Sequence, residues 1–148
     1  MRVPPIKNLA SDIIDVTGWV TEYELASKYA AARAAVVPLR FGAGVKLKVV
    51  EALWEGLPLV TTSIGAQGLE GLHEVAAVVD EAAAIAQELV RLLRDDVSWV
   101  DQAQRQLRYA RAHFSCQESI AAMAEATSAA ATNAERRGPI YRSGLRYA

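Results

Sequence analysis

The sequence of 148 residues contains a single cysteine, Cys116, so no disulfide bond can form within the chain. It also lacks an excess of basic residues, because 16 lysines and arginines against 17 acids give a formal net charge of -1, which argues against general nucleic-acid binding. No apolar run approaches the roughly 20 residues of a membrane-spanning helix. The start, MRVPPIKNLASD, lacks the apolar core of a secretory signal peptide. We therefore expect a cytoplasmic protein whose membrane contact is at most peripheral.

The chain is rich in apolar residues, at 52% hydrophobic and 22% charged, which is typical of a folded α/β domain. Several short apolar runs lack polar alternation, as parallel strands do when both of their faces are covered. We expect strands at residues 13–19, 34–39, 57–62 and 75–80, with helices at 21–34 and 46–55. This alternation predicts a doubly wound α/β fold, a Rossmann-like parallel sheet with helices on both faces.

The C-terminal half is expected to be helical, at residues 80–96, 97–114 and 115–131. In the first of these helices, Ile85, Leu89 and either Leu92 or Leu93 recur at helical spacing and should face inward. The remainder, residues 133–148, mixes arginine, glycine and polar residues without a period, and we interpret it as a loop or disordered tail. This divides the chain into a domain at 1–132 and a tail at 133–148.

A glycine-rich stretch, PLRFGAGVKLKVVEALWEGLPLVTT, follows the second expected strand and leads into a helix. Ligands of open α/β sheets bind beyond the carboxyl ends of the strands. Gly42 and Gly44 would let the backbone approach a ligand, and the N–H groups of the next helix would point at it. An anion such as phosphate fits there, with Lys46 and Lys48 adding positive charge. The alternative is an ordinary tight connection with solvated lysines.

Glu51 favours the ligand hypothesis over the tight connection. If residues 46–55 form a helix, then Leu47, Val50 and Trp54 define its buried stripe, and Glu51 lies on or beside that stripe. A carboxylate there needs a partner, because burying an unpaired charge is costly. Either Glu51 forms an ion pair with Lys48, or it accepts hydrogen bonds from the hydroxyl groups of a ligand such as a ribose.

The run from VTGWVTEYEL through GAGVKLKVVEALWEGLPLVTTSIGAQGLEGL resembles the nucleotide-binding C-terminal domain of retaining GT-B glycosyltransferases, of the group 1 or family 4 type. The resemblance covers about residues 13–123. It rests on Gly-x-Gly, x-Lys-x-x-Glu-Ala, Gly-x-Pro-x-Val-x-Thr and Gly-x-x-Gly-Leu, in that order along the chain.

The resemblance implies a role for each matching position. Glu51 corresponds to the glutamate that holds the ribose of a nucleotide sugar. The loop at Gly42 and Gly44 corresponds to the donor-phosphate cradle, which the resemblance extends over the amides of Val45, Lys46 and Leu47, with charge from Lys48. Val20 and Thr21 correspond to the region that contacts the nucleobase. Many members carry a sugar-contacting glutamate where this chain has Ala43, so the resemblance leaves the identity of the sugar open.

The implied reaction transfers a sugar from a nucleoside diphosphate donor to a hydroxyl acceptor with retention, and needs no metal or other cofactor. The resemblance implies no assignable catalytic residue here. It also implies that an acceptor domain and two strands of the donor domain are missing, so that the chain is an N-terminally truncated, partial donor domain and is inactive alone. The alternative is a non-catalytic α/β fragment, or interaction module, that keeps the family core.

The missing strands would leave an open sheet edge. In the Rossmann order 3-2-1-4-5-6, the four expected strands correspond to positions 3 to 6, so the strand at 34–39 would lack its neighbour. Unpaired strand edges recruit other strands. Either residues 13–17 pair directly with the strand at 34–39, or a second chain fills the gap. We expect self-association.

Overall fold

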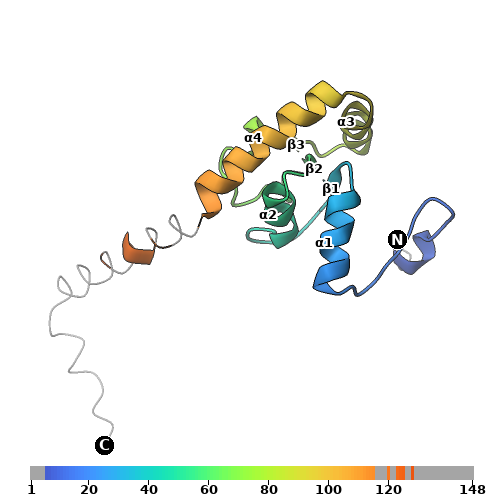
Figure 1. The fold of residues 1–148 in the computed structure, drawn as a ribbon, viewed down its shortest axis with the longest axis horizontal. Helices are drawn as coiled ribbons and strands as arrows, with labels where there is room; N and C mark the ends of the chain where they lie inside the picture. Colours follow the sequence, from blue (N-terminus) through green and yellow to red (C-terminus); the bar gives the residue numbers. More distant parts are fainter. Residues whose placement is uncertain (1–5, 116–119, 121–122, 126–127, 129–148) are drawn as a thin grey trace, which may run out of the picture.

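The computed structural model describes residues 6–115, 120, 123–125 and 128. Its centre is a parallel sheet of three strands in the order β1-β2-β3. The strands are β1 (Ala35–Val37), β2 (Leu59–Thr61) and β3 (Ala77–Val78). Helices pack on this sheet, so the predicted parallel α/β class is confirmed, and three of the four expected strands are present (Figure 1).

Within residues 6–115, four α-helices accompany the sheet, together with two short 3-10 helices. They are α1 (Glu22–Ala31), α2 (Leu47–Trp54), α3 (Ala82–Arg94) and α4 (Asp96–Phe114), with η1 (Ile6–Leu9) and η2 (Leu72–Glu74). The long helix α4 packs across both α2 and α3 (Figure 1). Most of the helix expected at 115–131, and all of the tail at 133–148, lie outside the described residues.

The prediction of a strand at residues 13–19 is wrong. That segment runs without regular structure apart from one antiparallel bridge between Ser11 and Ile14. Ile13 is 92% exposed and Trp19 is fully exposed. A β-prone run becomes a strand only when a neighbour satisfies its backbone and packs its side chains. No strand in the described part of the chain lies beside this segment.

The core forms where α2 and α4 meet β2. All three residues of β2 are buried, and Val49 and Leu53 of α2 and Ala110 of α4 are fully buried against it. In α3 the buried leucine is Leu92, which resolves the alternative between Leu92 and Leu93. None of the helices in the described part of the chain combines the length and the apolar character needed to cross a membrane.

Helix α2 buries a different stripe from the expected one. Its buried residues are Val49, Ala52 and Leu53, whereas Leu47 is 71% exposed and Trp54 is also exposed. The reason is that α2 is apolar around most of its circumference, so spacing alone fits more than one stripe, and packing against both sheet and α4 selects one. The helix ends at Trp54 with Glu55 as its C-cap, and Gly56 follows with a φ of 63°.

Candidate functional site

The loops that follow the carboxyl ends of β1 and β2 are tied together by side chains of β2 and its extension. Thr61 Oγ1 donates a buried hydrogen bond of 2.9 Å to the carbonyl of Val37, and Thr62 Oγ1 donates to the carbonyl of Leu39. Thr62 Oγ1 also accepts from the N–H of Gly65 at 3.2 Å. These bonds fix where the chain leaves β1, and they therefore position the glycine-rich loop at 40–46.

Gly65 and Gly68, in the loop after β2, let that loop pack closely against Thr61 and against Val45 of the glycine-rich loop. A Cβ atom at Gly65 would lie 2.0 Å from Thr61 Oγ1, and a Cβ atom at Gly68 would lie 2.9 Å from Val45 Cγ2. Gly68 also has a φ of +80°, which side chains rarely adopt. Gly65 and Gly68 entered the sequence-based predictions only through the resemblance, although their spacing also indicates a loop that packs on the first.

The glycine-rich loop itself has a backbone that depends on glycine. Gly42 has φ of +132° and Gly44 has φ of +72°. Lys46 is the N-cap residue of α2 and gives no side-chain cap, because its ammonium group only donates hydrogen bonds. Its Nζ donates to the carbonyl of Gly44. The first N–H groups of α2, at Leu47 and Lys48, therefore have no side-chain acceptor from the N-cap. Such an uncapped helix start carries partial positive charge.

Glu51 lies on α2 beyond this helix start and is half-buried. One of its carboxylate oxygens accepts a hydrogen bond of 3.1 Å from the hydroxyl of Tyr29 on α1. Burial, followed by this hydrogen bond and the charge of Glu51, raises the pKa of Tyr29 to about 12. The ion pair with Lys48 that was the alternative partner does not occur among the described residues. Tyr29 was not among the residues predicted for the site.

Val20 and Thr21 lie at the start of α1. Thr21 is the N-cap of α1 and forms a capping box with Glu24. Its N–H and hydroxyl both donate to the Glu24 carboxylate, at 2.7 and 2.9 Å, and these bonds hold the pKa of Glu24 below its ordinary value. The polar atoms of Thr21 are thus engaged in the cap, and a contact with a nucleobase here stays a prediction.

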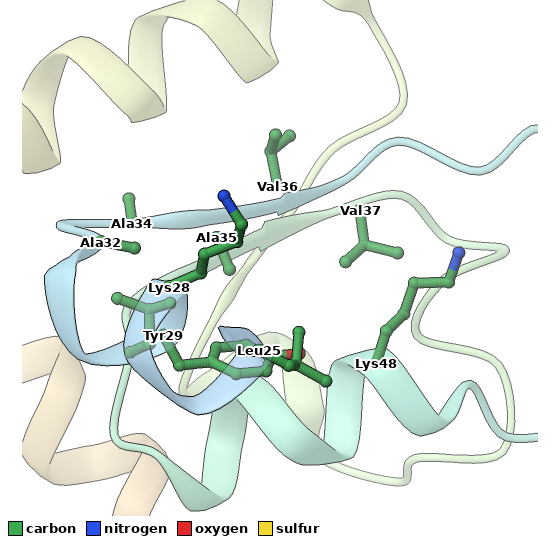
Figure 2. A pocket seen from close by; sticks show the side chains of 10 residues that line it. Leu25, Lys28, Tyr29, Ala32, Ala34, Ala35, Val36, Val37 and Lys48 are labelled. Atoms are coloured by element: carbon green, nitrogen blue, oxygen red, sulfur yellow. The ribbon is translucent and has the colours of Figure 1, made fainter. Parts of the chain in front are cut away.

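A groove of about 280 Å³ lies between α1, α2 and β1 (Figure 2). Apolar side chains of Leu25, Ala35, Val37 and Leu57 line it, together with Tyr29. Lys28 of α1 and Lys48 of α2 also line it. The groove lies beside Glu51, because Tyr29 both lines the groove and donates to that carboxylate.

The fold and the site together define the class of protein. It is a parallel α/β domain in which a glycine-rich loop lies beyond the carboxyl end of a strand and leads into an uncapped helix. Over residues 3–95 the chain matches the family described as glycosyl transferases group 1. This match covers more than half of the 148 residues, and the chain belongs to that family. Searches of curated proteins and of solved structures each gave no significant match.

Proposed function

We propose that this chain is the donor-binding domain of a glycosyltransferase that transfers a sugar from a nucleoside diphosphate sugar to a hydroxyl acceptor with retention. The observation that carries the proposal is the uncapped start of α2 behind Gly42 and Gly44, with Glu51 half-buried farther along the same helix. A helix start of this kind binds phosphate, and a carboxylate nearby can accept hydrogen bonds from a ribose. Membership of the glycosyltransferase family supports the same assignment.

In this proposal, the amides of Gly44, Val45, Lys46 and Leu47 hold the donor phosphates. Their N–H dipoles, the helix dipole and the side-chain charge of Lys48 stabilise the diphosphate as it leaves the sugar. The conformational freedom of Gly42 lets the loop adopt its shape. No metal ion is required for this role, because the positive charge comes from the chain itself.

Glu51 is proposed to hold the ribose with the carboxylate that Tyr29 orients. A carboxylate that already accepts one hydrogen bond keeps the other oxygen for ligand hydroxyls. Val20 and Thr21 are proposed to lie near the base.

Alone, residues 1–132 are proposed to form only part of a donor domain and to lack transferase activity. The groove and the edge of β1 are open to solvent, so water is not excluded from the site. We expect UDP and GDP to bind with dissociation constants near or above about 1 mM, or roughly -4 kcal/mol. We propose a cytoplasmic location, with which a single cysteine is compatible.

Equilibrium dialysis with UDP and GDP tests the donor role. Glu51→Gln should lower the affinity for both nucleotides at least threefold, because the neutral amide is a weaker acceptor for ribose hydroxyls. Glu55→Gln is the matched control, since Glu55 follows on the same helix and is exposed, and it should leave the affinity unchanged. Equal losses in both variants, or no binding by the unmodified chain at several millimolar nucleotide, would contradict the proposal.

A second candidate function is that of a non-catalytic interaction module. The observation that favours it is the unpaired outer edge of β1, next to the open groove. Absence of nucleotide binding together with stable self-association would select this alternative.

A further inference from the structure

The outer edge of β1 has unsatisfied backbone groups. β1 pairs with β2 on one side only, in the register Ala35 to Leu59 and Val37 to Thr61, and the N–H of Ala35 donates to Pro58. Backbone groups alternate sides along a strand, so the N–H and C=O of Val36 point to the open edge. Val36 is 44% exposed. This edge can therefore accept one more strand.

The groove below this edge is apolar and unfilled. Helix α1 contributes Leu25 and Tyr29 to its lining, yet none of the residues of α1 is buried. An amphipathic helix normally buries one face, whereas in α1 Tyr29 alone packs against the core, so the rest of its apolar side is uncovered by the described residues. A strand added to β1 would lie over this space and cover that face.

The charges beside the groove indicate what kind of strand fits. Lys28 and Lys48 line it and extend from α1 and α2 in the view of Figure 2. An apolar strand that carries acidic residues would complement them. The C-terminal residues 134–148, AERRGPIYRSGLRYA, carry four arginines and one glutamate, which is the wrong sign of charge.

One described segment of the chain has the right composition and no partner strand. Residues 12–17 read DIIDVT, with β-branched apolar residues and two aspartates. Ile13 is 92% exposed, and Ile14 is exposed as well. Asp15 already makes an ion pair of 3.7 Å with Lys28, so a carboxylate of this segment is attracted to one of the lysines that line the groove.

We propose that residues 12–17 of one copy of this chain add as a strand to the β1 edge of a second copy, and that the exchange is reciprocal. In the single chain this segment is folded onto itself by the Ser11–Ile14 bridge and lies on the far side of α1 from α2 and α4 (Figure 1). Gly18, at a φ of 65°, is the point where the segment can swing outward. Each copy carries one strand and one acceptor edge, so a two-fold dimer closes without leaving either unpaired.

Disulfide trapping between differently tagged chains tests the exchange. In a Cys116→Ser background, chains with Ile13→Cys and chains with Val36→Cys are mixed and oxidised. We expect a covalent heterodimer. The control replaces the second variant with Val97→Cys, an exposed position on α4, and should give at least tenfold less product. A yield no higher than the control, or a disulfide within monomers when both cysteines are placed in one chain, would overturn the proposal.

A charge swap tests the same contact without oxidation. Chains with Asp12→Lys and Asp15→Lys should dimerise at least tenfold more weakly than the unmodified chain in analytical ultracentrifugation, and so should chains with Lys28→Glu and Lys48→Glu. Mixing the two variants should restore dimers, because the reversed strand then meets a reversed groove. Dimers that form equally well in all three cases, or a mixture that stays monomeric, would refute the proposed pairing.

Discussion

Tyr29 is the residue that ties Glu51 to the rest of the domain. Its hydroxyl donates to the Glu51 carboxylate across the gap between α1 and α2, and α1 has no buried residue of its own. A hydrogen bond to a charged group contributes about 1.5–3 kcal/mol when buried, and less when partly exposed. The attachment of α1 should therefore depend strongly on this one bond.

We predict that Tyr29→Phe lowers the free energy of unfolding by about 1 kcal/mol, because the variant keeps the ring and loses only the bond. Urea denaturation followed by circular dichroism measures it. Tyr23→Phe is the control, since Tyr23 is exposed on the same helix and should change stability negligibly. If both variants lose the same free energy, the bond to Glu51 does not hold α1 in place.

The raised pKa of Tyr29 gives a pH dependence with a definite sign. Its pKa rises from 10.0 to about 12 on folding, so between these values the unfolded chain loses a proton that the folded chain keeps. Stability from this group is present below pH 10 and falls as the pH rises toward 12. We predict a steeper loss of stability over that range in the unmodified chain than in Tyr29→Phe. Identical slopes would contradict the assigned environment.

At the residue scale, the sequence located the glycine-rich loop but not the partner of Glu51. Gly42 and Gly44 stand in the loop between β1 and α2, and both have a positive φ, which only glycine adopts without strain. The partner of Glu51 was missed, because Tyr29 is 22 residues away and spacing on one helix says nothing about contacts with another. Whether Gly42, Gly44, Lys46, Lys48 and Glu51 bind a nucleotide sugar stays a proposal.

At the element scale, the two loops beyond β1 and β2 depend on glycine for different reasons. Gly44 and Gly68 share a positive φ, but only Gly68 has a neighbour that an added Cβ would strike. Alanine at Gly44 therefore adds backbone strain alone, whereas alanine at Gly68 adds strain and a clash with Val45.

We predict that Gly68→Ala destabilises the chain by about 2 kcal/mol and Gly44→Ala by about 1 kcal/mol, since alanine is strained at both positions. Thermal and urea unfolding of the two variants provides the comparison. Val45→Ala in the Gly68→Ala background should recover part of the difference. Equal costs at the two glycines would show that the loops do not pack as described.

Helices were easier to predict than strands in this chain, for a local reason. The capping box of Thr21 and Glu24, and the glycine at position 56, mark helix ends through contacts a few residues apart. The segment 13–19 has equally strong β-prone residues but no neighbouring strand, and a strand depends on contacts far away in the sequence. The predicted buried stripe of α2 was wrong for a related reason. The elements that pack on α2, which are β2 and α4, decide which face of this helix is covered.

At the scale of the whole molecule, the open edge of β1 lies beside the proposed donor site. The groove that runs along this edge includes Lys48, and Tyr29 links the groove to Glu51. A strand that covers the groove would exclude water there and strengthen the electrostatic contacts of the site. Nucleotide affinity should therefore rise with protein concentration if the chain dimerises through this edge.

Amide-resolved NMR titration with UDP and GDP tests whether the loop at 40–46, the start of α2 and Glu51 form a nucleotide-sugar donor site. We expect the largest saturating shifts on the amides of Gly44, Val45, Lys46, Leu47 and Lys48, and we expect Glu51→Gln to weaken the response while Glu55→Gln does not. Shifts that are absent at several millimolar nucleotide, or that concentrate on α3 and α4 instead, would contradict it.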